Sequence, residues 1–309
     1  MKIVIPDDYQ RACADLACLS MLKDHQVIIL GDLERDPAAK AALAEAEALV
    51  LIRERTRIDA DFLGRTPRLR CISQTGKVSG HIDLDACAAA KVVVMEGTGS
   101  PVAPAELTWA LILAARRGVV PAAHAMRHGQ WQTNIGDVLD GQTIGIWGYG
   151  KIGRRIAGYA RAFGMRVLVW GSPDSRHAAE SDGLIAAPDR AAFFAESDVI
   201  TVHLRLAPAT RGIITQTDLA RMKPSALFVN TSRAELVAPG ALLDALHEGR
   251  PGFAALDVYE SEPIYDRRHP LLSMPNVLCT PHIGYVERRS YELYFGQAFD
   301  NLLAFAASG

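Results

Sequence analysis

Short runs of β-branched residues alternate with alanine-rich stretches along almost the whole chain. This alternation is produced by βαβ units, in which a helix connects two parallel strands of one sheet. The first third of the chain predicts strands at Lys2 to Ile5, Gln26 to Leu30, Ala48 to Ile52, Arg70 to Ser73 and Lys91 to Met95. The chain is therefore predicted to be an α/β protein with parallel sheets.

The pattern is interrupted by glycines and prolines at Glu96 to Glu106, before a long apolar helix predicted at Leu107 to Arg117. A second series of strands follows at Thr143 to Trp147, Arg166 to Trp170, Val199 to His203, Ala226 to Asn230, Phe253 to Asp257 and Val277 to Thr280. A last helix is predicted at about Glu287 to Ala307. Because no strand follows it, we expect this helix to run back to the first domain. We therefore expect two doubly wound domains, one of residues 1–97 with 285–309 and one of residues 98–284.

The charges are nearly balanced, with 33 lysine and arginine residues, 35 aspartate and glutamate residues and a net charge of −2. Both signs are interspersed, which argues against a nucleic-acid or membrane-surface partner. The five cysteines are scattered and include no C-x-x-C pair, so neither a disulfide framework nor a metal site is expected. Because no apolar run has membrane-spanning length and the polar N-terminus does not resemble a secretion signal, we expect a cytoplasmic protein.

A glycine motif follows the strand predicted at Thr143 to Trp147 and opens a helix. The G-x-G-x-x-G motif comprises Gly148, Tyr149, Gly150, Lys151, Ile152 and Gly153. Its first glycine permits a tight turn, its second lets the backbone approach a pyrophosphate, and its third lets helix and strand pack closely. The order of strand, motif and helix predicts a dinucleotide site, with the pyrophosphate at the helix N-terminus.

The second strand of such a site usually ends near an aspartate or glutamate that binds the ribose of NAD. Here the strand ends at Gly171 and is followed by Ser172, Asp174 and Arg176. Asp174 can reach a ribose hydroxyl, whereas Ser172 and Arg176 can accommodate the 2′-phosphate of NADP. Since no strand-end carboxylate repels that phosphate, we expect NAD(H) to be favoured only slightly over NADP(H).

Three further chemically capable residues follow strands of the second domain. They are Arg233, Glu262 and His282, in the segments FVNTSRAEL, AALDVYESEP and CTPHIG. An arginine fork can grip a carboxylate and polarise the neighbouring carbonyl, and a histidine can give or take a hydroxyl proton. A carboxylate beside the histidine orients its ring and stabilises its charged form. Together these groups supply what hydride transfer at a 2-oxo acid requires.

At these segments the sequence resembles the D-isomer-specific 2-hydroxy-acid dehydrogenases, the family that includes D-3-phosphoglycerate dehydrogenase and glyoxylate/hydroxypyruvate reductase. GYGKIG resembles the family's dinucleotide motif, and VNTSRAELV, LDVYESEP and TPHIG resemble its arginine, glutamate and histidine motifs. The resemblance spans nearly the whole chain. It implies a Rossmann NAD(P)-binding domain inserted into a flavodoxin-like substrate domain, and interconversion of a 2-oxo acid and its D-2-hydroxy acid.

The resemblance also implies roles for individual residues of the second domain. Arg233 would bind the substrate, His282 would be the acid/base, and Glu262 would pair with His282. The implied cofactor contacts outside the glycine motif and the following strand end are His203, Thr231 and Asp257, the last of them at the nicotinamide amide.

In the first domain, Ser73 to Cys87 resembles the family's glycine-rich loop, whose backbone amides hold the substrate carboxylate. Gly76 and Lys77 match this loop, but Val78 replaces its second glycine. Arg53 and Arg55 match a basic pair of the phosphoglycerate-type members. They either face a second anionic group on the substrate or form a solvated strand end.

Two other positions near the expected substrate pocket depart from the family pattern. Arg205 stands where a proline is common, and Tyr285 stands where a second glycine is common. The helix after Pro104 is more apolar than one buried face requires. In the family this helix and the following arm, here roughly Val120 to Leu139, form a two-fold contact, so we expect a homodimer.

Two alternative functions use a similar framework. A formate dehydrogenase would carry glutamine in place of Glu262, so the glutamate argues against it. A dinucleotide-sensing regulator, like the dehydrogenase-related corepressors, could retain Arg233, Glu262 and His282. A turnover assay with a panel of 2-oxo acids discriminates between an enzyme and such a regulator.

Overall fold

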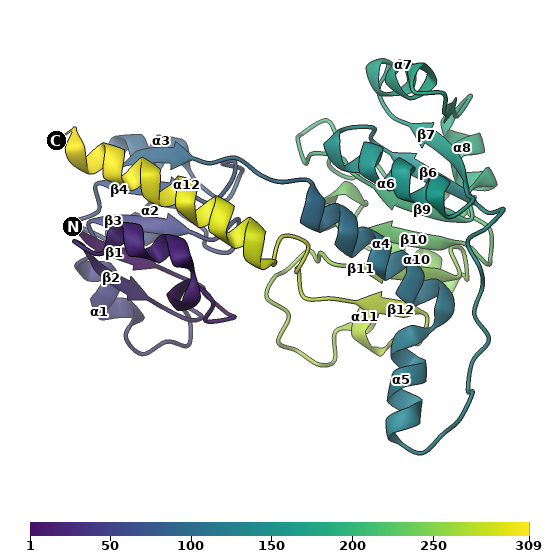
Figure 1. Cartoon of the computed structure of the whole chain (residues 1–309), viewed down its shortest axis with the longest axis horizontal. Coiled ribbons are helices and arrows are strands. Elements are labelled where there is room, and N and C mark those ends of the chain that lie inside the picture. Colours follow the sequence, from purple (N-terminus) through teal and green to yellow (C-terminus); the bar gives the residue numbers. More distant parts are fainter. Residues whose placement is uncertain (309) are drawn as a thin grey trace. The chain divides into compact units, whose positions relative to one another are not determined.

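The computed structural model describes residues 1–308, and the chain divides into two compact units. Unit 1 comprises Met1–Ser100 together with the segment from Val286 onward, and unit 2 comprises Pro101–Tyr285. Each unit contains one parallel sheet covered by helices (Figure 1). Within the described residues, no helix combines the length and apolar character needed to cross a membrane.

Unit 1 is built on a five-stranded sheet in the order β2-β1-β3-β4-β5, and all its strand pairs are parallel. Its strands are β1 (Lys2–Ile5), β2 (Gln26–Ile29), β3 (Ala48–Leu51), β4 (Cys71–Gln74) and β5 (Val93–Glu96). Its helices are η1 (Cys13–Asp15), η2 (Ala17–Leu22), α1 (Ala39–Ala44), α2 (Ala60–Gly64), α3 (Leu84–Ala89) and α12 (Arg288–Ala307). Helix α12 packs on β3, β4 and β5, so a segment that follows unit 2 in sequence completes unit 1.

Unit 2 is built on a seven-stranded parallel sheet in the order β12-β11-β10-β9-β6-β7-β8. Its strands are β6 (Thr143–Trp147), β7 (Arg166–Trp170), β8 (Ile185–Ala186), β9 (Val199–Val202), β10 (Leu227–Asn230), β11 (Phe253–Leu256) and β12 (Val277–Cys279). Its helices are α4 (Val102–Arg117), α5 (Val119–Arg127), α6 (Lys151–Ala162), α7 (Pro173–Ser181), α8 (Arg190–Glu196), α9 (Gln216–Leu219), η3 (Ala234–Leu236), α10 (Ala241–His247) and α11 (Pro270–Ser273).

Alternate residues of the central strands of unit 2 enter two different hydrophobic cores. Leu227 and Val229 of β10 join the core that contains Ile156 of α6, whereas Phe228 joins the core that contains Phe193 of α8. Side chains of a strand point alternately to its two faces, so both faces of the sheet are covered by helices. This two-sided burial explains why the strands are continuous apolar runs.

The structure confirms the predicted fold class of two doubly wound parallel-sheet domains. The eleven strands expected from the sequence are present, with ends that differ by at most two residues. The short edge strand β8 was not expected. Helix α4 begins at Val102, five residues before the predicted start at Leu107, because Pro104 lies in its first turn, where a missing N–H breaks no helical hydrogen bond.

Candidate active site

Parallel strands present their carboxyl ends at one edge of a sheet, and the predicted residues of unit 2 collect at this edge. Arg233 follows β10, Glu262 follows β11, and His282 follows β12, and these three strands are neighbours. The glycine motif follows β6 on the other side of β9. One edge of the sheet thus carries both the dinucleotide motif and the predicted catalytic groups.

His282 and Glu262 form a direct hydrogen bond at this edge. The Nδ1 atom of His282 lies 2.5 Å from Oε2 of Glu262, and the two side chains are 22% and 32% exposed. The other carboxylate oxygen of Glu262 accepts a hydrogen bond from the backbone N–H of Tyr259 at 2.8 Å. Because the pair engages Nδ1, the second ring nitrogen of His282 is the one left for proton exchange with a bound molecule.

The backbone around His282 is held by the buried carboxylate of Asp257. This carboxylate accepts hydrogen bonds from the Thr280 hydroxyl at 2.6 Å and from the N–H groups of Ile283 and Gly284, both at 2.8 Å. His282 itself has a φ of +52°, a left-handed conformation that is uncommon outside glycine. Burial raises the pKa of Asp257, and its three hydrogen bonds oppose that shift. Asp257 therefore fixes the loop from which His282 projects.

The ring of Tyr285 lies against the ring of His282. The two rings meet edge to face, with centroids 5.6 Å apart and planes at 80°. Tyr285 is buried, so it limits the directions in which the imidazole can turn. Arg205, the other departure from the family pattern, is exposed after β9.

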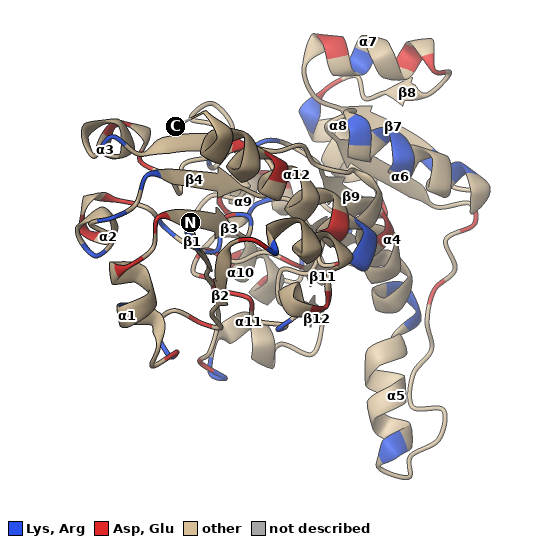
Figure 2. Cartoon of the chain, turned by 60° about the vertical axis from the view of Figure 1, so that its left-hand side comes forward, with Lys and Arg blue, Asp and Glu red and all other residues tan. Residues whose placement is uncertain are grey.

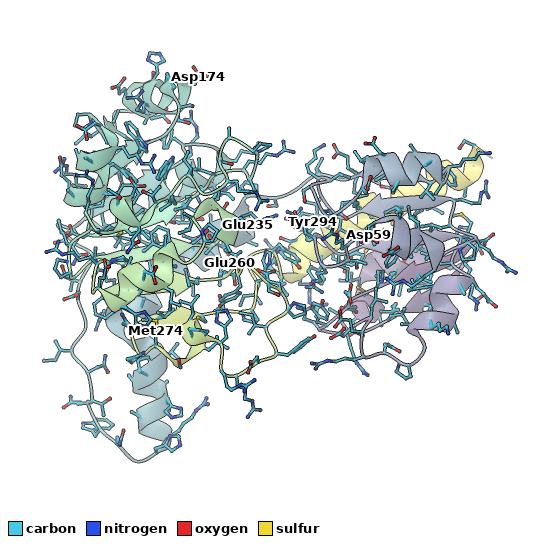
Figure 3. All side chains as sticks on the ribbon, turned by 180° about the vertical axis from the view of Figure 1, so that it is seen from behind. Asp59, Asp174, Glu235, Glu260, Met274 and Tyr294 are labelled. Atoms are coloured by element: carbon cyan, nitrogen blue, oxygen red, sulfur yellow. The ribbon has the colours of Figure 1, made fainter. Side chains whose placement is uncertain are left out.

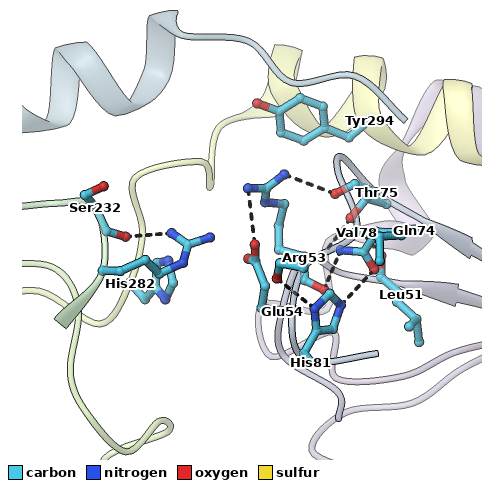
Figure 4. A network of polar contacts seen from close by, with 12 residues as sticks. Leu51, Arg53, Glu54, Gln74, Thr75, Val78, His81, Ser232, His282 and Tyr294 are labelled. Atoms are coloured by element: carbon cyan, nitrogen blue, oxygen red, sulfur yellow. Dashed lines mark hydrogen bonds and ion pairs between the residues drawn. The ribbon is translucent and has the colours of Figure 1, made fainter. Parts of the chain in front are cut away.

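Arg233 is held by its own loop and remains partly exposed. Its Nη1 donates to the carbonyl of Ser232 at 2.6 Å, and its backbone carbonyl accepts from the Asn230 side chain at 2.9 Å. Ser232 in turn donates to the carbonyl of Leu204 at 2.6 Å. Figure 4 shows Ser232, whose carbonyl accepts the hydrogen bond from Arg233. These contacts direct the arginine without burying its planar fork.

The glycine motif has the backbone shape that a pyrophosphate requires. Gly148 has a φ of +100°, and a Cβ on it would lie 2.6 Å from the carbonyl oxygen of His203. A Cβ on Gly153 would collide with the carbonyl of Gly148, whereas Gly150, the N-cap of α6, faces open space. No side chain caps α6, so its first N–H groups are available to an anion. These residues fit a dinucleotide.

The other residues of the motif, Tyr149, Lys151 and Ile152, differ in burial. The hydroxyl of Tyr149 donates to Asp182 at 2.8 Å, and burial together with this hydrogen bond raises the pKa of Tyr149 to about 12. Lys151 is exposed, and Ile152 packs beside the core.

His203 and Thr231, also predicted to bind the cofactor, make contacts within unit 2. His203 Nε2 lies 3.0 Å from the hydroxyl of Thr201, and burial lowers the pKa of His203 to about 3. The hydroxyls of Thr231 and Thr108 are 2.7 Å apart. His203 is therefore a neutral group at the end of β9.

After β7, Gly171 is followed by Ser172, whose hydroxyl accepts from the N–H of Ser175 at 3.3 Å and caps α7. The Arg176 guanidinium carbon lies 4.9 Å from the centroid of the Trp170 ring. Asp174 is exposed and lies in the first turn of α7 (Figure 3). The strand end therefore presents hydroxyl and guanidinium groups, and its nearest carboxylate is that of the exposed Asp174.

Among the predicted substrate-binding residues of unit 1, Gly76 has a φ of +101°. A Cβ on Gly76 would collide with the guanidinium of Arg53, so the arginine lies directly against this glycine. Lys77 is paired with Glu96, and the N–H of Val78 donates to the same carboxylate at 3.1 Å. Arg55 donates to the carbonyl of Asp7 at 2.7 Å and to the hydroxyl of Tyr291 at 3.0 Å.

Three polar residues of these loops were not singled out by the sequence. Glu54 lies beside Arg53, Glu96 beside Lys77, and His81 joins Ser79 and Gln74 by hydrogen bonds of 3.0 and 3.3 Å. The available signal was weak, because an acidic residue after a strand is ordinary surface composition. The adjacent charges in the segment RER were the only local indication of an internal ion pair.

Comparison with known proteins places this arrangement in a family. A model described as "D-isomer specific 2-hydroxyacid dehydrogenase, NAD binding domain" matches residues 109–284. Glyoxylate reductase of Aeropyrum pernix is 36% identical over 303 residues, which cover 93% of this chain and 89% of the relative. D-3-phosphoglycerate dehydrogenase of Rattus norvegicus is 33% identical over 92% of this chain but only 52% of its own length.

Solved structures give the same answer. A phosphoglycerate oxidoreductase from Vibrio cholerae has a TM-score of 0.96 at 52% identity, covering 100% of both chains. A D-lactate dehydrogenase from Aquifex aeolicus, complexed with NAD and lactic acid, has a TM-score of 0.78 at 25% identity, covering 99% of this chain and 96% of that one. A Granulicella formate dehydrogenase, at 24% identity and a TM-score of 0.79, shows the fold alone. The chain belongs to the D-isomer specific 2-hydroxyacid dehydrogenase family and is an NAD-dependent oxidoreductase.

Proposed function

We propose that Arg233, Glu262 and His282 carry out the chemistry by which this enzyme interconverts a 2-oxo acid and its D-2-hydroxy acid. The observation that carries this proposal is the 2.5 Å contact between His282 and Glu262, at the sheet edge that also holds Arg233 and the dinucleotide motif. Bound NAD(H) supplies or accepts the hydride.

Each residue of this chain has a separate task in the proposed reaction. His282 gives its proton to the substrate oxygen during reduction and takes it back during oxidation. Glu262 keeps the proton on Nδ1 and stabilises the charged ring. Arg233 binds the substrate carboxylate with its two-pronged fork and polarises the adjacent carbonyl.

A panel of 2-oxo acids, assayed with NADH and NADPH in parallel, tests the proposal. We expect oxidation of NADH with at least one short 2-oxo acid. Dinucleotide binding without turnover of any 2-oxo acid would instead support the sensing regulator. Arg233→Ala should raise the Michaelis constant of the active acid, because its carboxylate loses a charged hydrogen-bond partner, roughly a 10- to 100-fold effect. An unaltered Michaelis constant would contradict the role of Arg233.

We propose that the cofactor is held by the amides of Gly150 to Gly153, with His203, Thr231 and Asp257 near the nicotinamide. At the ribose, Ser172 and Arg176 make discrimination against NADP(H) modest, because neither repels a 2′-phosphate and Gly171 supplies no carboxylate at the end of β7. Fluorescence titration with both reduced cofactors tests this. A hundredfold preference for NADPH would refute the slight preference for NADH.

We propose that unit 1 serves as the substrate-binding domain, through Gly76, Lys77 and Val78, and that unit 2 serves as the dinucleotide domain. The positive φ of Gly76 supports a loop whose amides converge on an anion. The cytoplasmic location expected from the sequence stays a prediction.

We also propose a two-fold homodimer formed through α4, α5 and the chain that returns to Leu139. Helix α5 and the returning chain project from the rest of unit 2 and carry few charges (Figures 1 and 2). Their exposed side chains include Val120, Met126, Trp131 at 74% exposure, and Ile135. Exposed apolar side chains that gather on one projecting segment are characteristic of protein interfaces. A monomer in sedimentation at micromolar concentration would rule the dimer out.

A further inference from the structure

The basic side chains expected at the substrate in unit 1 are balanced by the chain's own acidic groups. Arg53 lies against Gly76, and its Nη2 is 3.7 Å from a carboxylate oxygen of Glu54. The two side chains are only 21% and 17% exposed, so solvent screens this pair incompletely. Arg53 also donates to the carbonyl of Thr75 at 3.4 Å, which keeps its guanidinium on the loop (Figure 4).

The second cation of the loop is balanced in a similar way. Lys77 pairs with Glu96, the last residue of β5, and the same carboxylate accepts the N–H of Val78 at 3.1 Å. An amide expected to face the substrate carboxylate is thus hydrogen-bonded within unit 1. The exposure of Lys77 and Glu96, 63% and 44%, makes this pair weaker and easier to rearrange than the pair formed by Arg53.

Arg55 is directed into unit 1 by three contacts. Its two terminal nitrogens donate to the Asp7 carbonyl and the Tyr291 hydroxyl, and its guanidinium carbon lies 4.8 Å from the centroid of the Tyr9 ring. The carboxylate of Asp7 also interacts electrostatically with Arg55. Arg53 and Arg55 were expected to face a second anionic group of the substrate. In the structure, acidic groups of unit 1 already compensate the positive charge of this surface.

We propose that Glu54 is a specificity-determining residue that disfavours substrates with a second anionic group. This inference rests on the proposed function and names its substrate class: 2-oxo monocarboxylic acids with an uncharged side chain. A phosphate ester carries about 1.5 to 2 negative charges at neutral pH, so next to Glu54 it meets repulsion as well as the attraction of Arg53. An uncharged side chain meets no such repulsion.

The experiment compares hydroxypyruvate with 3-phosphohydroxypyruvate, two 2-oxo acids that differ only in the second anion. With NADH, the wild-type enzyme should have a kcat/KM at least tenfold higher for hydroxypyruvate. Glu54→Gln keeps the shape and removes the charge. It should raise kcat/KM for 3-phosphohydroxypyruvate roughly tenfold, which corresponds to one partly screened charge interaction of about 1.4 kcal/mol. It should change kcat/KM for hydroxypyruvate less than twofold. The gain should shrink in 0.5 M salt, since salt screens exposed charges.

Glu34→Gln is the matched control, because it removes an exposed carboxylate of unit 1 in the connection after β2. It should leave both kcat/KM values unchanged. The proposal is overturned if the wild-type enzyme prefers the phosphorylated acid, or if Glu54→Gln changes both acids by the same factor.

A binding measurement separates this inference from the proposed function. D-glycerate and 3-phospho-D-glycerate are titrated into NAD-loaded wild-type enzyme and Glu54→Gln by calorimetry. If neither oxo acid is reduced, the proposed reaction is wrong. Charge selection is still supported if the wild type binds D-glycerate more tightly than 3-phospho-D-glycerate and if this difference in affinity is smaller in Glu54→Gln. Equal ratios of affinity in both proteins overturn it.

Discussion

The loop that carries His282 and the loop that carries Gly76 are both held by carboxylates, but of opposite kinds. Asp257 holds the His282 loop from a fully buried position, through three hydrogen bonds of 2.6 to 2.8 Å. Glu96 holds the Gly76 loop from the surface, through Lys77 and one backbone N–H. The first support is rigid, because breaking it would leave a buried charge without partners, whereas the second can exchange its partners with water.

The difference matches what each loop is proposed to do. A proton donor has to keep its position within a fraction of an ångström, which requires a fixed backbone and a restrained ring. A surface that selects substrates by charge tolerates local movement, because electrostatic interactions change gradually with distance. The two loops therefore illustrate geometric control in unit 2 and electrostatic control in unit 1.

The largest effect is expected from His282→Ala. This change removes proton transfer, which typically contributes about 10²- to 10⁴-fold to the rate, so kcat should fall by that factor. Cofactor affinity should change little. His247→Ala, at the exposed end of α10, serves as the control and should retain full activity. Near-normal turnover of His282→Ala would show that His282 is not the proton donor and that its fixed position does not control the reaction.

A smaller loss is expected from Asp257→Asn. Asparagine has one acceptor oxygen for three donors, and its amide would face an N–H of the loop, so His282 should lose its fixed position. We expect kcat to fall about 10- to 100-fold, as for other residues that orient a catalytic group. The melting temperature should change little, since the lost hydrogen bonds are offset by removal of a buried charge. If the melting temperature fell markedly together with kcat, Asp257 would stabilise the fold in general and would not specifically position His282.

The same variant carries a pH signature. Burial raises the pKa of Asp257 above its ordinary 3.8. At a pH between the ordinary and the raised pKa, the folded protein therefore keeps a proton on Asp257 that the unfolded chain has released. The contribution of Asp257 to the free energy of unfolding is therefore complete below pH 3.8 and is lost as the pH rises through the raised pKa. Urea unfolding at pH 4 and pH 7 should show the wild type losing stability relative to Asp257→Asn at the higher pH.

Gly76→Ala tests the other loop. The positive φ disfavours alanine, and the new Cβ would displace the guanidinium of Arg53. We expect KM to rise about tenfold, kcat to stay within threefold, and stability to fall by about 1 kcal/mol. Gly80→Ala is the control, because a Cβ there meets open space and the backbone has no positive φ. A loss confined to kcat would erase the distinction between the two loops.

The smallest effect is expected at Tyr285. Tyr285→Phe keeps the ring that contacts His282 and should retain activity, whereas Tyr285→Leu removes an aromatic contact worth about 0.5 to 1.5 kcal/mol. Turnover of the leucine variant should fall two- to tenfold, with KM unchanged. If phenylalanine and leucine behave alike, ring restraint adds nothing to the geometric control by Asp257.

Periodicity predicted most of the fold, because both sheets bury apolar runs that are easily recognised. The ends of β6 and β7 are those expected, whereas β8 was missed because Ile185–Ala186 is too short to show a pattern. The contact of Glu262 with His282 was anticipated from their complementary chemistry. The contacts of Asp257 with residues 280–284 were not, since they depend on β11 and β12 being neighbours, and no local pattern records that pairing.

Helix α12 has a consequence for how the protein is made. During synthesis, β1 to β5 leave the ribosome long before α12, and all of unit 2 is translated in between. Helix α12 supplies Phe295, Phe299 and Leu302 to the interior of unit 1. Part of the apolar surface of the unit 1 sheet therefore stays uncovered until α12 has been synthesised. Unit 2, whose chain is continuous, can fold in that interval. The unit that begins first is therefore completed last, so its early strands keep apolar surface exposed until the end of the chain has been made.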